Sequence, residues 1–294
     1  MEITNQRKKF NWKPVVFIVP AMIVLIVFNI YPLIRMVYNS FFNWNMISDM
    51  KFIGFENYER LFNSSDFYQI LGNTVFYVIF TVAAGMILGL LLALYLSKDT
   101  PINRFLQSVS FMPYVVSMAS ISLLMSWMMN YDYGFINYFL SLFGIEPINW
   151  LGDPDVAMTS LVIISVWKNL GYNALILISA LQSIPRHLYE AASLDNASRW
   201  RVFTKISLPM ISPTIFFLTI ISIINSFKMF ETANIMTQGG PLNATTTLVY
   251  AIYEEGTLYF KVGYASAIGV VLLVILAVLT IIYFRLLSRR VHYQ

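Results

Sequence analysis

Six long apolar stretches constrain what this chain can fold into more than any other feature. Each holds roughly the 20 apolar residues that a helix needs to cross the hydrocarbon layer of a membrane. They lie near residues 14–37, 70–96, 107–129, 156–181, 210–230 and 263–287. Strands of a membrane barrel would need only about 10 residues each, of alternating polarity, so runs of this length predict helices. We therefore expect an all-α membrane protein with six transmembrane helices.

The composition leads to the same class. Of 294 residues, 58% are hydrophobic and 12% are charged, which is more apolar surface than a soluble core of this length can bury. Because no linker, low-complexity segment or block of charge divides the chain, residues 1–294 are expected to form a single transmembrane domain. We also expect a short helix around residues 55–62 and an interfacial segment at 133–145, which is too short to span.

The placement of the charges predicts the orientation in the membrane. Most of the 19 Lys and Arg residues lie at the two chain ends and in the loops of one side, and most acidic residues lie in the opposite loops. Arg7, Lys8 and Lys9 precede the first span, and Arg289 and Arg290 follow the last. Because basic residues mark the inner side of a membrane protein, both termini are predicted to be cytoplasmic. The basic ends are interpreted as anchors on lipid, not as nucleic-acid sites.

The chain has few side chains of the kinds that carry out catalysis or bind metal ions. It has no cysteine and two histidines, His187 and His292, which lie far apart in the sequence. No G-x-x-x-x-G-K-[ST] phosphate loop occurs anywhere in the chain. An intramembrane enzyme would need a nucleophile with its base, or a set of metal ligands, within the spans. We therefore predict no catalytic residues, no metal site and no cofactor in this chain.

A polar loop between the fourth and fifth spans has the pattern of two short helices. Ser183 is predicted to cap a helix over 185–194, and Asn196 to form the turn, because Asn tolerates the left-handed conformation. Ser198 is predicted to cap a second helix that ends at Pro209. Such a pair can insert into a groove on another protein or can rest on lipid headgroups, and the spacing does not choose between them.

The same loop resembles the EAA loop of bacterial ATP-binding-cassette importer permeases. The resemblance is carried by Glu190, Ala191 and Ala192, then by Asp195, Asn196 and Ala197, and then by Ile206, Ser207, Leu208 and Pro209. Asn196 stands where the family usually has Gly, and Asn is the next best residue at positive φ. The resemblance implies that the coupling loop, residues 184–209, docks onto an ATPase subunit through the residues from Glu190 to Ala197.

Four further strings narrow the resemblance to carbohydrate-type permeases of the maltose, lactose and glycerol-phosphate kind. They are YPLIRMVYNSF, FIGFENYERLF, NYDYGFIN and MTQGGPLNATTTLVY. The resemblance implies a multi-pass subunit of the bacterial cell membrane that forms the translocation path with a second, homologous permease. It also implies two partner ATPase subunits, which bind ATP and Mg²⁺, and an extracytoplasmic solute-binding protein. ATP-driven closure of the ATPases would then swing the path from inward-open to outward-open.

Polar side chains recur on one face of the fourth span and on one face of the fifth. Because polar groups are costly in hydrocarbon, they usually face a cavity or a partner. The predicted substrate-binding residues are Ser165, Lys168, Asn169 and Tyr172 in the fourth span and Ser222, Asn225, Ser226 and Met229 in the fifth. The two faces could hydrogen-bond a polyhydroxylated solute, and in the resembled family the maltose-type site is built from these two spans.

Three alternatives stay open at this point. The polar residues could bond across helices as packing contacts, and Lys168 could pair with an acid on a partner permease. The whole chain could also be a stand-alone secondary transporter or channel, which calls for inverted repeats, buried acids or broken helices. No carboxylate lies inside a predicted span, so coupling to protons has little support. The sequence does not choose between oligosaccharides, monosaccharides and glycerol phosphate as the solute.

Overall fold

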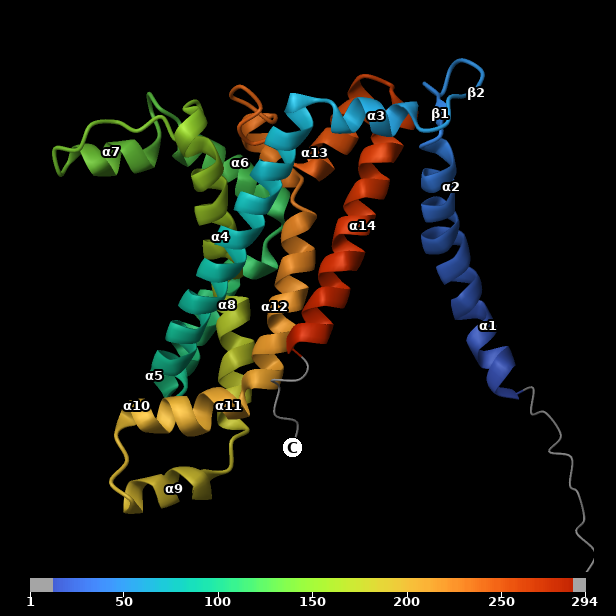
Figure 1. Cartoon of the computed structure of the whole chain (residues 1–294). Coiled ribbons are helices and arrows are strands. Elements are labelled where there is room, and N and C mark those ends of the chain that lie inside the picture. Colours follow the sequence, from blue (N-terminus) through green and yellow to red (C-terminus); the bar gives the residue numbers. More distant parts are fainter. Residues whose placement is uncertain (1–12, 288–294) are drawn as a thin grey trace, which may run out of the picture.

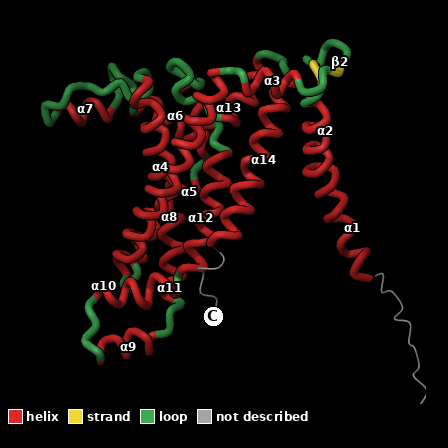
Figure 2. The backbone as a smooth tube through the Cα atoms, in the orientation of Figure 1, coloured by secondary structure: helices red, strands yellow, loops and turns green. Residues whose placement is uncertain are grey.

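The computed structural model describes residues 13–287, and the statements below concern that part of the chain. The predicted basic residues Arg7, Lys8, Lys9, Arg289 and Arg290, together with His292, lie outside the described residues. Helices make up most of the fold, and the loops gather at its two ends (Figures 1 and 2). The two strands, β1 (Phe42–Asn43) and β2 (Lys51–Phe52), form a small antiparallel pair in the loop between the first and second spans.

The helical elements follow one another along the described chain with short connections. The first half contains α1 (Lys13–Leu25), the π-helical turn η1 (Ile26–Ile30), α2 (Tyr31–Asn39), α3 (Glu56–Phe62), α4 (Ser65–Leu96), α5 (Pro101–Val115), α6 (Met118–Met128) and α7 (Phe135–Ser141). The second half contains α8 (Pro154–Gln182), α9 (Arg186–Leu194), α10 (Arg199–Val202), η2 (Phe203–Ser207), α11 (Leu208–Met210), α12 (Ser212–Phe227), η3 (Ala233–Thr237), α13 (Leu248–Tyr253), η4 (Glu254–Leu258) and α14 (Val262–Leu287). The predicted short helix at 55–62 is present as α3, and the segment at 133–145, predicted to be too short to span, contains the short helix α7.

Four helical segments of the described chain are each long and apolar enough to cross a membrane alone. They are Val16–Asn39, Ser65–Leu96, Pro154–Gln182 and Val262–Arg285. Two bent pairs also qualify if each pair counts as one span: Pro101–Val115 with Met118–Met128, and Arg199–Met210 with Ser212–Phe227. Each of these six overlaps one predicted stretch, so the prediction of an all-α membrane fold with six spans is confirmed.

The third span is not the continuous helix that the apolar run at 107–129 predicted. It breaks between α5 and α6, whose axes differ by 95°. Val116 and Ser117 have extended backbone, and the Ser117 hydroxyl accepts a hydrogen bond from the Ser120 amide to start α6. Pro113 lies just before the break and lacks the N–H that would continue the helical ladder. The break falls inside the predicted stretch at 107–129, whose overall apolar character does not reveal it.

One detail of the predicted inner loop is wrong, and another differs by one residue. Ser183 does not cap α9: it closes α8, and its hydroxyl donates to the carbonyl of Ala180 at 2.7 Å. The second helix ends at Met210, one residue beyond the predicted end at Pro209. The helical path continues to Met210 and then bends by 65° into α12, whose first turn contains Pro213.

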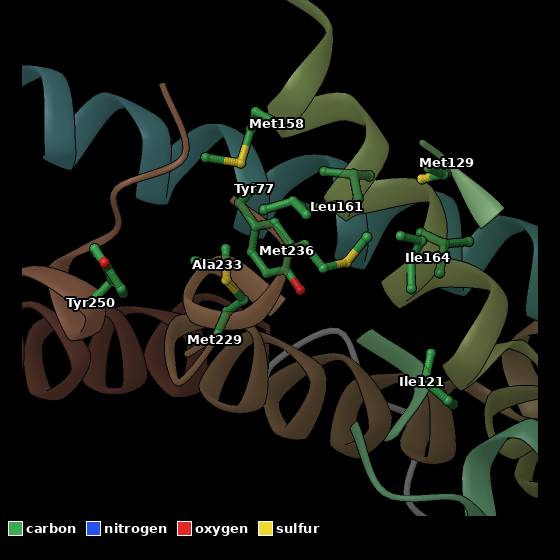
Figure 3. Close-up of a cluster of buried hydrophobic side chains, with 12 residues drawn as sticks. Tyr77, Ile121, Met129, Met158, Leu161, Ile164, Met229, Ala233, Met236 and Tyr250 are labelled. Atoms are coloured by element: carbon green, nitrogen blue, oxygen red, sulfur yellow. The ribbon is translucent and has the colours of Figure 1, made fainter. Parts of the chain in front are cut away.

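The core lies where α4 packs along α8, with α5 and α12 beside them (Figure 1). Glycine permits this approach, since a Cβ on Gly89 would meet the Cβ of Asn173 at 2.9 Å. Towards the end of the bundle opposite α9, buried side chains gather around Tyr77, among them Met158, Met229 and Met236 (Figure 3). Helices α4, α8 and α12 therefore form a packed unit, with polar positions of each facing the others at mid-depth.

The first span stands apart from this unit (Figure 1). None of the residues in its most apolar window is buried, and α2 packs on α14, where a Cβ on Gly269 would meet Sδ of Met36 at 2.7 Å. The start of α1, the end of α14 and the helices α9 to α11 all lie toward one end of the molecule (Figure 1). This arrangement agrees with termini on one side of the membrane, and their cytoplasmic location stays a prediction.

Candidate functional site

A small cavity lies at mid-depth in the bundle, between α4, α5, α8 and α12. Its volume is about 100 Å³. Six of the eight predicted substrate-binding residues line it: Ser165, Asn169 and Tyr172 from α8, and Ser222, Asn225 and Ser226 from α12. The fold thus brings together two polar faces that lie about 50 residues apart in the sequence, with their hydroxyl and amide groups at one cavity.

The polar groups of this cavity differ in whether they already have partners. The hydroxyl of Tyr77 donates to Oγ of Ser165 at 2.6 Å, and Nδ2 of Asn169 donates to the carbonyl of Ser165 at 2.8 Å. Within the described chain, the side chains of Ser222, Asn225 and Ser226 have no hydrogen-bond partner. The α8 wall is therefore held in place by internal bonds, whereas the α12 wall offers free donors and acceptors.

Lys168 and Met229 do not line the cavity. Lys168 is 8% exposed, and its Nζ donates to the backbone carbonyl of Tyr114 at 2.9 Å. Met229 follows α12 and is buried among the side chains around Tyr77 (Figure 3). Its carbonyl accepts a hydrogen bond from the hydroxyl of Thr247, so it helps to hold the loop after α12 against the bundle.

Several residues of the cavity were not predicted from the sequence. Tyr77, Thr81 and Gly85 of α4 line it at positions i, i+4 and i+8, which is one helical face. That spacing could have predicted a cavity-facing side of this span, because the polar side chains of Tyr77 and Thr81 recur on it at helical spacing. Tyr114 also lines it and stacks on Tyr172, with ring centroids 4.3 Å apart. Its contribution depends on the break after α5, which the apolar run does not reveal.

The inner loop forms two helical layers below the bundle, α9 and then α10 to α11 (Figure 1). Glu190, Ala191, Asp195 and Asn196 are exposed, Ala197 is half-buried, and Ala192 is buried with the amide of Ala197 bonded to its carbonyl. Asn196 has φ of 50°, as predicted for the turn. Ser198 caps α10 by accepting from the Arg201 amide, as predicted. Four of the six predicted coupling residues are therefore accessible to another protein.

Six helical crossings, a polar cavity at mid-depth and an accessible helical loop at one end describe a membrane transport subunit. Residues 85–293 match the family described as binding-protein-dependent transport system inner membrane component, and the chain belongs to this family. It is a multi-pass membrane subunit of a binding-protein-dependent importer. The predicted resemblance to importer permeases is thus confirmed, and the alternative of a stand-alone secondary transporter or channel is set aside.

Relatives match over almost the whole chain. The sulfoquinovosyl glycerol transport system permease protein SmoG of Agrobacterium fabrum is 34% identical over 94% of this chain and 90% of its own length. The sn-glycerol-3-phosphate transport system permease protein UgpA of Pectobacterium atrosepticum is 34% identical over 99% of this chain and 100% of its own. The probable ABC transporter permease protein YurN of Bacillus subtilis is 35% identical over 95% of this chain and 96% of its own length.

A solved structure has the same fold. It is the crystal structure of a bacterial alginate ABC transporter in complex with an alginate pentasaccharide-bound periplasmic protein. One of its chains aligns with a TM-score of 0.84 and 24% identity, over 95% of this chain and 94% of that one. At this identity, the likeness establishes the arrangement of the helices and not the identity of the solute.

Proposed function

We propose that this chain is one of two homologous permease subunits that together form the path for a carbohydrate, an oligosaccharide in particular. An extracytoplasmic binding protein delivers the solute, and two partner ATPase subunits, which hold ATP and Mg²⁺, drive the change between inward-open and outward-open states. The coupling loop lies in the cytoplasm, and the chain itself carries out no hydrolysis. Alternating access requires that the solute bind the two states with different affinity.

The observation that carries this proposal is the polar cavity between α8 and α12. Its free side-chain donors and acceptors on α12 face hydroxyl, amide and phenol groups on α8 and α4, a combination that suits hydroxyl groups of a sugar. At about 100 Å³ it is smaller than the roughly 300–1,000 Å³ typical of small-molecule sites. The cavity must therefore widen during the cycle. The relatives named for sulfoquinovosyl glycerol and sn-glycerol-3-phosphate support a polyhydroxylated solute.

The exposure of the coupling loop supports docking of an ATPase subunit. Leu194 and Trp200 flank the turn at Asn196 and are 85% and 73% exposed. Large apolar side chains at the centre of an accessible surface are the usual anchors of a protein interface. Glu190 and Asp195 lie beside them and are also exposed, so a groove with apolar walls and basic groups at its rim would fit this surface.

The docking role is tested by Glu190→Lys in the assembled importer. Reversing this exposed charge is expected to abolish ATP-dependent uptake and the co-purification of the ATPase subunits, while insertion into the membrane stays normal. The matched control is Glu146→Lys, an exposed charge reversal in the loop that follows α7 at the opposite end, which should keep the ATPase subunits bound. Normal uptake by the Glu190→Lys variant would refute the docking role.

A further inference from the structure

The break in the third span leaves backbone carbonyls at the end of α5 without helical hydrogen-bond partners. The last four carbonyls of a helix have no partner within it, and no water is available in the hydrocarbon region to replace them. Helix α5 ends at Val115, and the chain continues through two extended residues. Tyr114 belongs to this last turn, so its carbonyl needs a donor from elsewhere in the protein.

Lys168 of α8 supplies that donor. Its Nζ lies 2.9 Å from the carbonyl oxygen of Tyr114 and 5.1 Å from the centroid of the Tyr114 ring. An ammonium group at a helix C-terminus also meets the negative end of the helix dipole, which is favourable. The side chain is buried, and its ammonium contacts the end of α5, not the cavity. The cost of a lysine at membrane depth is thus offset by a charge-assisted hydrogen bond.

Lys168 belongs to a face of α8 that holds α5 at three points. Positions 168, 171 and 172 follow one another at i, i+3 and i+4 on one side of the helix. Gly171 admits the backbone of α5, because a Cβ there would overlap the carbonyl of Ser110. Tyr172 stacks on the ring of Tyr114 with an angle of 11° between the ring planes. The stacked rings are part of the cavity wall.

We propose that Lys168 is a positioning residue: by capping the broken end of α5 it holds Tyr114 against Tyr172 and thereby sets the width of the solute cavity. It contacts neither the solute nor an acid of a partner subunit. This inference concerns the same cavity as the proposed function but does not depend on which solute passes. Its test can therefore fail or succeed independently of any transport measurement.

The test uses the absence of cysteine from the chain. Ser222→Cys places a single thiol on the α12 wall, and its rate of reaction with N-ethylmaleimide in the assembled, membrane-reconstituted importer reports access to the cavity. Lys168→Met, which removes the donor and keeps most of the length, is expected to raise this rate about tenfold, equivalent to about 1.4 kcal/mol. Lys168→Arg, which keeps charge and donors, is expected to restore the slow rate.

Two controls separate this role from a general loosening of the fold. A single thiol at Ala267, buried in α14, should label at the same rate whether or not the chain also carries Lys168→Met. Lys51→Met, which replaces an exposed lysine in β2, should leave the labelling of Ser222→Cys unchanged.

If Lys168→Met fails to assemble, Lys168→Gln, which keeps an N–H donor without charge, should give an intermediate rate. An unchanged rate at position 222, equal acceleration at position 267, or no recovery with arginine would overturn the proposal.

Discussion

At the scale of single residues, some polar side chains of the spans make packing contacts between helices, and others are free to bind a solute. Asn173 donates to the carbonyl of Gly85 at 3.2 Å, and Ser165 accepts from Tyr77, so these groups join α4 to α8. Such bonds between membrane helices contribute on average about 0.6 kcal/mol each. Asn225 on α12 has no such partner among the described residues and faces the cavity. Under the proposed function, the residues bonded between helices serve packing, and the unpartnered ones at the cavity serve solute recognition.

Gly171 yields a prediction at this scale. Gly171→Ala is expected to destabilise the protein by about 1–3 kcal/mol, because the added methyl group overlaps a backbone carbonyl that no rotamer change can move. Gly72→Ala is the matched control, since a Cβ at Gly72 meets nothing within 4 Å and the substitution should be neutral or slightly stabilising. Thermal unfolding followed by size-exclusion chromatography measures both variants, and equal melting temperatures would contradict the close approach of α5 to α8.

At the scale of elements, the sequence locates the spans but not their breaks. Long apolar runs fix where helices cross, because chain polarity changes sharply at both ends of each run. The break after α5 depends on Pro113 and Ser117, which both lie inside the predicted stretch at 107–129. The cap at Ser198 and the turn at Asn196 are predictable, since each depends on local backbone chemistry. Tyr77 recurs with Thr81 at the spacing of one helical face, whereas Tyr114 reaches the cavity only through the packing of α5, which no local pattern encodes.

A prediction at the scale of elements concerns the turn of the coupling loop at Asn196. Asn196 has φ of 50°, a conformation that costs residues other than Gly, Asn and Asp roughly 1–2 kcal/mol. Asn196→Gly is expected to leave ATPase binding intact, whereas Asn196→Val should weaken it, because the turn that orients α9 becomes strained. Co-purified ATPase subunit per permease is the measurement. Retention of full binding by the valine variant would show that docking does not require this turn.

At the scale of the whole molecule, the apolar surface of the first span is not covered by other parts of the described chain. In the first span, α2 packs against α14, while the apolar helix α1 stands apart from the bundle (Figure 1). Residues of four helices of this chain line the cavity, and under the proposed function its small volume requires a change of shape before the solute can pass. These features fit a subunit that works within an assembly, in which energy comes from partner subunits.

The central claim is that this chain moves solute only as part of an ATP-driven assembly. The most direct measurement is uptake into proteoliposomes of radiolabelled maltose and sn-glycerol-3-phosphate, alongside a wider panel of oligosaccharides, with the chain alone and with the complete importer. We predict uptake only when the second permease, both ATPase subunits, the binding protein and ATP are all present. Uptake by the chain alone at the rate of the complete importer would contradict the claim.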